Sequence, residues 1–428
     1  MHVEATTFKQ TELGVLPSDW TIVEIGEVAD TSSGTTPPRN QYDRFYQGGV
    51  HAWVKTLDLN NGVIRRTDES VTDSALEETS LRLFPVGSVL VAMYGGLRQI
   101  GRTGLLRVPA AVNQAITAIR PKPDRLWPDF LLFYLNYRVG YWQSVASSSR
   151  KDPNITGADV RAFRLPLPPI AQQQQIAAAL TDADALIDSL RKLLTKKRHI
   201  RRGSMEELLT GKRRLPGFSE SWNEGTLGDV VAELAAGVSV NSDATEASVG
   251  VPSVVKTSAM KGGVFNPAEC KPIIQTDLTR ATTPLRKNTL LISRMNTPDL
   301  VGEVGYVDQD YDWLYLPDRI WMTRMRSSDC VCVRWLGFLL SSAQYKRRIG
   351  DAATGTSGSM KNIAKGALLG VPVSFPKVDE QRAIAQVLAD MDVDIAAVEC
   401  RLAKACAMKL AMAQALLTGR IRLVKPNA

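Results

Sequence analysis

The chain has 428 residues, of which 44% are hydrophobic and 22% are charged. This composition excludes wholesale disorder and leaves room for more than one domain with its own core. Lys and Arg together number 52 against 44 Asp and Glu, a net charge of +8. Such a basic surplus suits a nucleic-acid partner, but many soluble proteins carry as much, so charge alone assigns no function.

The sequence also indicates a cytoplasmic protein with reduced thiols. Its five cysteines are odd in number and form no C-x-x-C pair, which favours free thiols over a disulfide framework or a zinc ribbon. The opening residues MHVEATTFKQTELG lack the apolar core of a signal peptide, and no run approaches 18 consecutive apolar residues. We therefore expect no membrane association.

The first globular segment has the pattern of an α+β domain. Short β-rich runs begin at Thr21 (TIVEIG), Gly87 (GSVLVAMYG) and Gln114 (QAITAIR), separated by turns rich in Gly, Pro and Asn. A helix is expected near Pro128 (PDFLLFYLN). The order of the strands in a sheet cannot be read from these runs.

A long helix is expected next, from Gln172 to Leu209, with Gly211 as its C-terminal cap. It would extend about 57 Å at about 1.5 Å per residue. Its apolar residues are spaced 4, 3, 4, 3 and 4 apart, at Ile176, Leu180, Ala183, Ile187, Leu190 and Leu194. This is the seam of a coiled coil, which a lone helix cannot bury.

The same unit recurs further along the chain. The segment LLTGKRRL, which contains Gly211, recurs as LLTGRIRL around Gly419, an offset of 208 residues. Upstream the offset becomes 201, so that Lys55 corresponds to Lys256. The second helix repeats the apolar stripe at Ile384, Leu388, Met391, Ile395, Val398, Leu402 and Ala405.

We interpret the chain as a tandem duplication of one unit, a globular domain followed by a long helix. The two helices are expected to pair as an antiparallel coiled coil. The alternative is that each helix packs against its own globular domain. The expected segments are domain 1 (1–168), helix 1 (169–211), domain 2 (212–376), helix 2 (377–419) and a tail (420–428).

Several segments resemble the specificity subunits of type I restriction-modification enzymes. LPSDWTIVEIGEVAD from Leu16 and LPGFSESWNEGTLGDVV from Leu215 look like the openings of two target recognition domains. AVNQAITAIRP resembles the Asn-Gln strand of that family, whereas the second copy departs with LPDRIWMTRM. LPLPPIAQQQQIAAAL and FPKVDEQRAIAQVL resemble the entries to its two central helices, with Gln172-Gln173 in place of the usual Glu-Gln.

The resemblance implies a non-catalytic, DNA-binding protein. Each recognition domain would read one half of a bipartite, asymmetric site in double-stranded DNA, with a spacer set by the helix pair. Two modification subunits would dock on the helices and methylate adenine, and a restriction subunit is a further partner. S-adenosylmethionine, ATP and Mg²⁺ are expected in those partners, and no cofactor in this chain.

A search for catalytic motifs agrees with a binding protein. The chain has no P-loop, and LPPI at Leu167 lacks the acid and the aromatic residue of an adenine methyltransferase turn. With only three histidines, acid–base or metal chemistry has little material. We therefore expect no active site and no metal site.

Candidate DNA contacts come from matching positions in the two copies. Lys and Arg suit phosphates, Arg, Gln and Asn suit base edges, and small polar loops can cradle phosphates through backbone amides. An ordinary surface loop is the competing interpretation for each. The first copy offers Lys55, Thr56, Tyr94, Arg98, Gln99, Ser149, Arg150 and Lys151, and the second Lys256, Thr257, Arg294, Asn296, Thr356, Ser357, Ser359 and Lys361.

The densest positive run is RKLLTKKRHIRR, from Arg191 to Arg202 in the first helix. It could bind phosphates without reading sequence, or it could be a solvated coiled-coil face or a surface for a partner subunit. The matching stretch of the second helix is far less basic.

Two other functions stay open from sequence. The chain could be the specificity component of a type II enzyme that cuts beside its site, where a fused catalytic partner would discriminate. It could also be an assembly scaffold that no longer binds DNA, for which the salt dependence of duplex binding would be close to zero.

Overall fold

The computed structural model describes residues 7–147, 154–243, 247–327, 329–354 and 360–423. The chain divides into two compact units. Unit 1 comprises Met1–Arg191 with Cys400–Ala428, and unit 2 comprises Lys192–Glu399. Two long helices, α7 (Ile170–Leu208) and α12 (Val378–Leu417), contribute one part to each unit.

Unit 1 is built on a five-stranded sheet with the order β4-β11-β8-β9-β6. Its central strands β8 and β9 are buried along their whole lengths, which explains the unbroken apolar sequence of β8. The runs predicted from Gly87 and Gln114 are β8 and β11. The strands are β4 (Ala29–Ser33), β6 (Gly62–Ile64), β8 (Val89–Ala92), β9 (Thr103–Leu106) and β11 (Ile116–Pro121).

Smaller sheets complete this unit. β10 (Ala110–Val112), β5 (His51–Val54) and β7 (Glu69–Val71) form one sheet. β1 (Phe8–Thr11) pairs with β2 (Gly14–Pro17), and β3 (Thr21–Glu24) pairs with β12 (Arg164–Leu167). The run predicted from Thr21 ends as a strand at Glu24, because the next residues form a short helix with a capping box.

The described helices of unit 1, besides α7, are mostly short. They are α1 (Ile25–Val28), η1 (Arg39–Gln41), α2 (Tyr42–Phe45), η2 (Thr56–Asp58), α3 (Asp73–Glu78), α4 (Pro128–Tyr137), α5 (Val139–Ser147) and α6 (Gly157–Arg161). The helix predicted near Pro128 is α4, which begins with that proline at its first turn and contacts β9.

The core of unit 1 draws on both ends of the chain. Ile176 and Leu180 of α7 pack in the same cluster as Trp20 and Phe130. Leu416 and Leu417, at the end of α12, belong to that cluster too, and Leu417 is fully buried. The C-terminal segment is therefore a structural part of the N-terminal unit.

Unit 2 has a six-stranded sheet with the order β14-β24-β20-β22-β17-β16. A second sheet has the order β18-β15-β23-β19, and a third β21-β26-β25. The strands of the first are β14 (Val231–Ala236), β16 (Met260–Lys261), β17 (Gly263–Phe265), β20 (Thr289–Ser293), β22 (Val304–Val307) and β24 (Ile320–Met325).

The remaining strands and helices of unit 2 are mostly short. The other strands are β13 (Asn223–Thr226), β15 (Ser253–Val255), β18 (Cys270–Pro272), β19 (Pro284–Leu285), β21 (Met295–Asn296), β23 (Tyr311–Tyr315), β25 (Ala353–Thr354), β26 (Lys361–Ile363) and β27 (Pro372–Phe375). The helices are α8 (Leu227–Val230), η3 (Thr257–Ala259), η4 (Gln275–Arg280), α9 (Val333–Ser341), α10 (Ala343–Asp351) and α11 (Lys365–Leu369).

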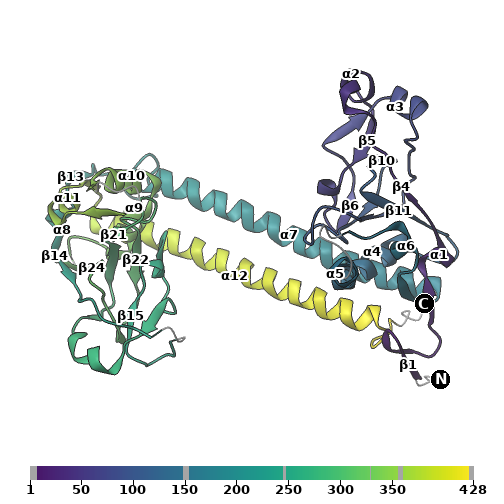
Figure 1. Cartoon of the computed structure of the whole chain (residues 1–428). Helices are drawn as coiled ribbons and strands as arrows, with labels where there is room; N and C mark the ends of the chain where they lie inside the picture. The colour runs from purple at the N-terminus through teal and green to yellow at the C-terminus, as the bar shows by residue number, and fades with distance from the viewer. Residues whose placement is uncertain (1–6, 148–153, 244–246, 328, 355–359, 424–428) are drawn as a thin grey trace. The chain divides into compact units, whose positions relative to one another are not determined.

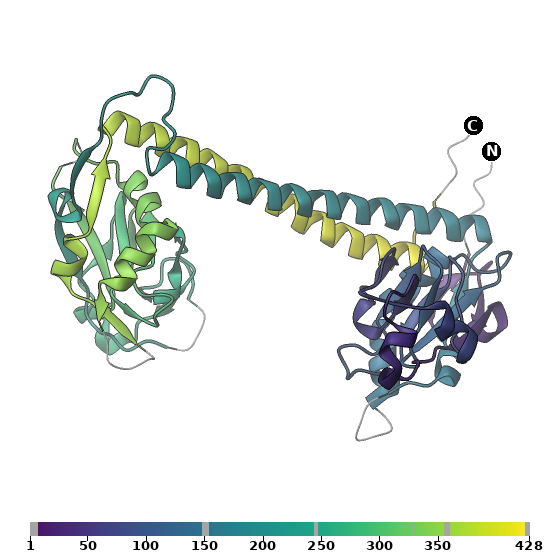
Figure 2. The same ribbon diagram turned by 90° about the horizontal axis from the view of Figure 1, so that it is seen from above.

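The two long helices pack together, as the apolar stripes predict, and Figures 1 and 2 show them side by side. In unit 2 the order of the contacts is antiparallel, because Lys197 bonds Asp394 at 2.7 Å while Arg201, further along α7, bonds the earlier Asp392. Most of the predicted seam is buried. The glycines that follow the two helices have a left-handed backbone, φ +70° at Gly211 and +67° at Gly419, as expected for C-terminal caps.

Within the part of the chain that the structure describes, no helix is long and apolar enough to cross a bilayer.

Candidate nucleic-acid interface

In unit 1 a turn at Asn113–Ala115 brings two of the predicted contact segments together. The backbone N–H of Asn113 donates to the carbonyl of Val54 (3.1 Å), next to Lys55. The N–H of Met93 donates to the carbonyl of Ala115 (2.8 Å), next to Tyr94. The Lys55 segment and the Tyr94 segment therefore flank this turn on its two sides.

Lys55 is not a free cation. Its Nζ lies 2.6 Å from Oε1 of Glu69, and Arg39 binds the other oxygen of that carboxylate at 2.7 Å. The Arg39 guanidinium also stacks 4.3 Å from the ring centroid of Tyr46. Glu69 stands opposite Trp53 in the β5–β7 pair, which is what places it beside the residue after β5. The charge of Lys55 thus orders the end of β5, and Thr56 begins the helix η2.

The pKa of Glu69 is lowered by this arrangement. Partial burial works in the opposite direction and raises it, but the hydrogen bonds and charges of Lys55 and Arg39 outweigh that effect. The carboxylate is therefore ionised over a wider pH range than an isolated glutamate.

The loop after β8 is open and carries a mixture of side chains suited to DNA. Tyr94 is 44% exposed and Leu97 47% exposed, and Arg98 is exposed as well. Gly95 and Gly96 have φ values of +116° and +80°, which only glycine adopts readily, so the loop can turn sharply here. Gln99 is half-buried at the end of the loop.

The small polar loop of unit 1 that contains Ser149, Arg150 and Lys151 is only partly covered by the described residues. The N–H of Ile155 donates to the carbonyl of Met93 at 3.1 Å, so the described end of this loop lies beside the Tyr94 loop. Ser149, Arg150 and Lys151 lie outside the described residues, as do Thr356, Ser357 and Ser359 of the second copy. Their contacts stay predictions.

Unit 2 has one backbone hydrogen bond of the same kind, with different side chains in the turn. The N–H of Arg294 donates to the carbonyl of Arg319 (2.9 Å), in a turn that contains Pro317 and Asp318 where unit 1 has Asn113 and Gln114. Lys256 pairs with Glu269 at 3.6 Å. Thr257 begins η3 and is half-buried.

Strand pairing brings three further candidates of unit 2 together. Asn296 stands opposite Lys361 in the β21–β26 pair. The Arg294 guanidinium lies 5.8 Å from the ring centroid of Trp321, and its Nε donates to Oδ1 of Asn362 at 3.4 Å. Asn296 uses its amide locally, donating to Ser293 Oγ at 3.3 Å and accepting from the Thr297 N–H at 2.9 Å. Arg294 and Lys361 are half-buried.

Sequence reasoning missed three residues of these surfaces. Arg39 shares Glu69 with Lys55, and exposed Gln114 accepts a hydrogen bond from the Thr36 hydroxyl. Arg319 is exposed at the turn of unit 2 and has no ion pair among the described residues. The signal for Arg319 was available, because the first-copy strand from Gln114 aligns with LPDRIWMTRM.

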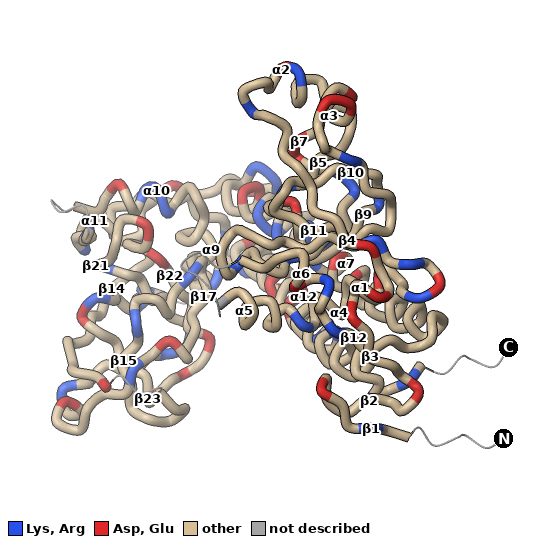
Figure 3. The backbone as a smooth tube through the Cα atoms, turned by 45° about the vertical axis from the view of Figure 1, so that its right-hand side comes forward, with Lys and Arg blue, Asp and Glu red and all other residues tan. Residues whose placement is uncertain are grey.

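Charge does not mark the interface by itself. Figure 3 shows blue and red positions interspersed over both globular parts. The described residues contain no group of three or more His, Cys, Asp or Glu side chains that could hold a metal ion. The geometry of both units is that of polar loops displayed at sheet ends, the arrangement that binding surfaces commonly use.

Comparisons with known proteins agree with this geometry. Residues 17–196 match the family model described as "Type I restriction modification DNA specificity domain". The chain is 30% identical over 192 residues to the type I restriction enzyme MjaIX specificity subunit of Methanocaldococcus jannaschii, a match covering 44% of this chain and 43% of that relative. The chain thus spans less than half the length of this relative.

Other similarities extend over nearly the whole chain. The MjaVIII specificity subunit of the same organism is 23% identical over 441 residues, which cover 98% of this chain and 97% of the relative. The crystal structure of a type I restriction-modification system S subunit from M. genitalium superposes with a TM-score of 0.59 at 14% identity, covering 93% of this chain and 96% of that one. That likeness shows a shared fold. Together with the matched domain, these relatives show that the chain is similar to the type I restriction-modification DNA specificity subunits.

Proposed function

We propose that this chain reads a bipartite, asymmetric site in double-stranded DNA, with one half-site read by each unit. The observation that carries the proposal is the matched pair of turns, at Asn113–Ala115 and Pro317–Arg319. In each turn the last carbonyl accepts the N–H that follows a neighbouring strand, from Met93 to Ala115 in unit 1 and from Arg294 to Arg319 in unit 2, but the turns present Asn and Gln in one unit and Asp and Arg in the other. One scaffold with different displayed side chains can recognise two different sequences.

We further infer that the two units arose by internal duplication. Three matching contacts support this origin, each lying within its own unit. The N–H of Ile155 bonds the carbonyl of Met93, and the N–H of Ile363 bonds that of Arg294. Arg120 pairs with Asp30 across β11 and β4 at 3.5 Å, and Arg324 pairs with Glu233 across β24 and β14 at 2.8 Å.

The third match is at the start of each long helix. Gln173 Oε1 accepts from the N–H of Trp127, and Gln381 Oε1 accepts from that of Cys332, both at 2.8 Å. On this basis we propose recognition domains at 1–168 and 212–376. The helices at 169–211 and 377–419 would form an antiparallel coiled coil, and 420–428 a tail.

The chain itself would be non-catalytic and cytoplasmic. Two modification subunits would bring S-adenosylmethionine and methylate adenine, and a restriction subunit would bring ATP-dependent cleavage with Mg²⁺. For DNA contact we retain the predicted residues of both units and add Gln114 and Arg319. Lys55 and Lys256 then act mainly by ordering their loops, since each is paired with a glutamate.

The other two functions are less well supported. A type II component that cuts beside its site is not favoured, because the curated relatives described above are named as type I specificity subunits. The scaffold hypothesis predicts that any residual duplex binding has a log–log salt slope near zero. A protein that contacts phosphates instead loses affinity for the duplex as salt is added.

The proposal is tested by co-expressing the chain with the modification subunit of the same strain in a host without DNA methylation, followed by methylome sequencing. We expect one split motif of methylated adenines. Exchanging residues 1–168 for those of a relative should change one half of the motif and leave the other half intact. A complex that forms on purification but methylates no split motif would contradict the proposed function.

A further inference from the structure

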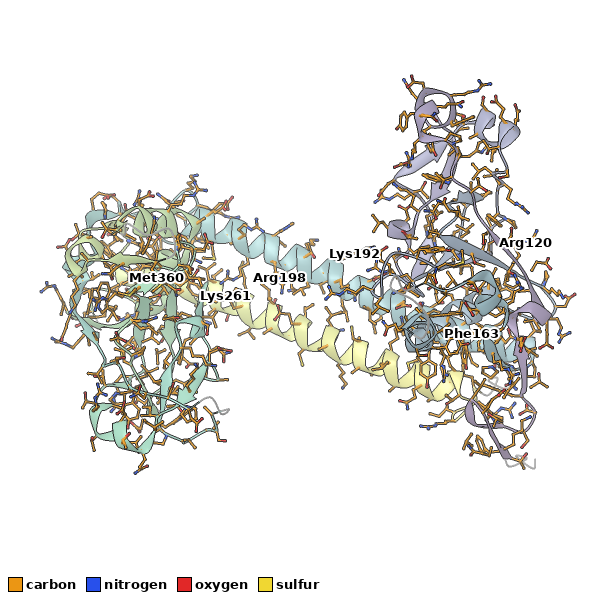
Figure 4. All side chains as sticks on the ribbon, viewed as in Figure 1. Arg120, Phe163, Lys192, Arg198, Lys261 and Met360 are labelled. Atoms are coloured by element: carbon orange, nitrogen blue, oxygen red, sulfur yellow. The ribbon has the colours of Figure 1, made fainter. Side chains whose placement is uncertain are left out.

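The cationic run of α7 is only partly used by contacts within the protein. Its seven cations are Arg191, Lys192, Lys196, Lys197, Arg198, Arg201 and Arg202. Lys197, Arg198 and Arg201 bind Asp394, Glu399 and Asp392 of α12, and Arg191 binds Asp188 on α7 itself. In Figure 4 Arg198 lies on the side of α7 that faces α12.

The other three cations form an exposed face. Lys192, Lys196 and Arg202 are all exposed, and no ion pair engages them among the described residues. At about 100° per residue, Lys192, Lys196 and His199 fall within about 60° of one another, and Arg202 lies at the edge of the same face. The buried seam residue Leu194 is on the side of the helix opposite Lys192, Lys196 and His199, and about 80° around the helix from Arg202. We call Lys192, Lys196, His199 and Arg202 the α7 cationic face.

This face is not a general property of the outer surface of such helices. The positions 208 residues later, on the exposed side of α12, are Cys400, Lys404, Ala407 and Leu410. These four positions of α12 carry one Lys or Arg, whereas the α7 cationic face carries three. Leu410 of α12 is an apolar side chain that is 69% exposed. A solvated coiled-coil face would need only generic polarity in both helices, so the difference indicates a ligand for α7.

We infer that the α7 cationic face binds the phosphate backbone of the duplex without reading its sequence. The inference rests on the proposed DNA-binding function and goes beyond it, since it assigns contacts outside both recognition surfaces. The face extends about 15 Å along the helix at about 1.5 Å per residue, which matches four to five base pairs at about 3.4 Å each. Flexible lysines suit phosphates as point charges and do not require a fixed register.

The competing occupant is an acidic surface of a protein partner. Ile200, beside the face, is 50% exposed and Leu193 is 37% exposed, so some apolar area is available. The cations outnumber these apolar residues, and exposed Glu206, one turn beyond Arg202, is the nearest acid after them. Phosphate is therefore the better fit, and the protein partner becomes an outcome of the test.

The test measures duplex affinity against salt for the full chain and for its complex with modification subunits. The variant carries Lys192→Gln, Lys196→Gln and Arg202→Gln, and glutamine keeps a high helix propensity at these exposed sites. A control with the same loss of charge carries Arg401→Gln, Lys404→Gln and Arg420→Gln, also exposed and without ion pairs among the described residues.

With about 0.9 counterion released per phosphate contact, three lost contacts should lower the log–log slope by about 2.7. Between 50 and 200 mM salt the wild-type affinity should then fall about 40-fold more than that of the variant. Target and scrambled duplexes should be affected equally, and the control should behave as wild type.

Three other results are informative. A variant slope equal to that of the wild type would overturn the inference. So would a variant that binds DNA normally but no longer co-elutes with the modification subunits, which would assign the face to a protein partner. A wild-type slope near zero would instead overturn the proposed DNA-binding function, and the inference with it.

Discussion

The side chain of Gln173 ties the start of α7 to the start of α4, because its Oε1 accepts the backbone N–H of Trp127 at 2.8 Å. Trp127 is the N-cap residue of α4. The Gln173 amide nitrogen donates to the carbonyls of Arg125 (2.9 Å) and Pro168 (2.8 Å), and the side chain is fully buried. One glutamine thus satisfies three backbone groups, one in a buried hydrogen bond and two in partly buried ones.

Removing this side chain should destabilise unit 1. Gln173→Ala removes the partner of one N–H and two carbonyls, at about 1–3 kcal/mol for a buried unsatisfied group and less for the two that are partly buried. We expect the free energy of unfolding to fall by about 3 kcal/mol in urea titrations. The neighbouring exposed Gln174→Ala is the matched control and should stay within about 0.5 kcal/mol of wild type. Equal effects of the two substitutions would contradict the proposed role.

The lowered pKa of Glu69 predicts a pH dependence. A carboxyl whose folded pKa lies below its unfolded value stabilises the fold above the unfolded pKa, near 4.5. This contribution is lost as the pH falls through the folded pKa. Glu69→Gln should therefore cost about 1 kcal/mol at pH 7, the scale of a partly exposed ion pair, and progressively less below about pH 4.5.

Unfolding measured at pH 7 and at pH 3 checks this, with the exposed Glu77→Gln on α3 as the control. A penalty for Glu69→Gln that is the same at both pH values would show that the Lys55–Glu69–Arg39 cluster does not depend on the charge of the carboxylate.

Arg98 and Arg319 should read different half-sites. If each contacts a base edge, its replacement by Ala should weaken binding by about 1–3 kcal/mol and relax the requirement at positions within one half-site only. Competition among duplexes with single substitutions measures this for each variant. Lys287→Ala is a suitable control. Exposed Lys287 precedes the N-terminal end of β20, whereas Arg294, which contacts the Arg319 turn, follows its C-terminal end. A uniform loss over all duplexes would assign the arginine to phosphate instead.

The end of α12 should stabilise unit 1 rather than unit 2. Leu417 is fully buried in the unit 1 core, so Leu417→Ala should cost about 2–5 kcal/mol. Limited proteolysis with mapping of the cut sites should show new cleavage within residues 7–147. Leu410→Ala, at a side chain 69% exposed on the same helix, should have little effect. New cuts confined to residues 223–375 would contradict this assignment.

The long helices could be predicted from sequence because their pattern is local and repeated. The expected helix from Gln172 to Leu209 is found at Ile170–Leu208, and both capping glycines have the expected backbone. Local periodicity and cap chemistry determine such features with little help from distant residues.

The polar surfaces could not be predicted to the same depth. Lys55 looked like a solvated or DNA-facing lysine, because nothing near it in sequence indicates that β7 returns Glu69 to its side. Such pairings depend on strand order and register, which a single sequence leaves open. The display of Arg319 likewise depends on a turn between two sheets, and residue type alone did not distinguish it from any other loop arginine.

The packing of Leu416 and Leu417 against Trp20 has a consequence for biosynthesis. Unit 2 is one continuous stretch of chain, so it can close as soon as Glu399 has left the ribosome. Unit 1 cannot complete its core until the last turn of α12 has been synthesised. Until then, Leu416 and Leu417 cannot cover the apolar residues around Trp20. At about 5–20 residues per second, that wait lasts roughly 10 to 50 s after α7 begins to emerge. The first part of the protein to be made is thus the last to be completed, and its folding depends on residues that are synthesised more than 200 positions later.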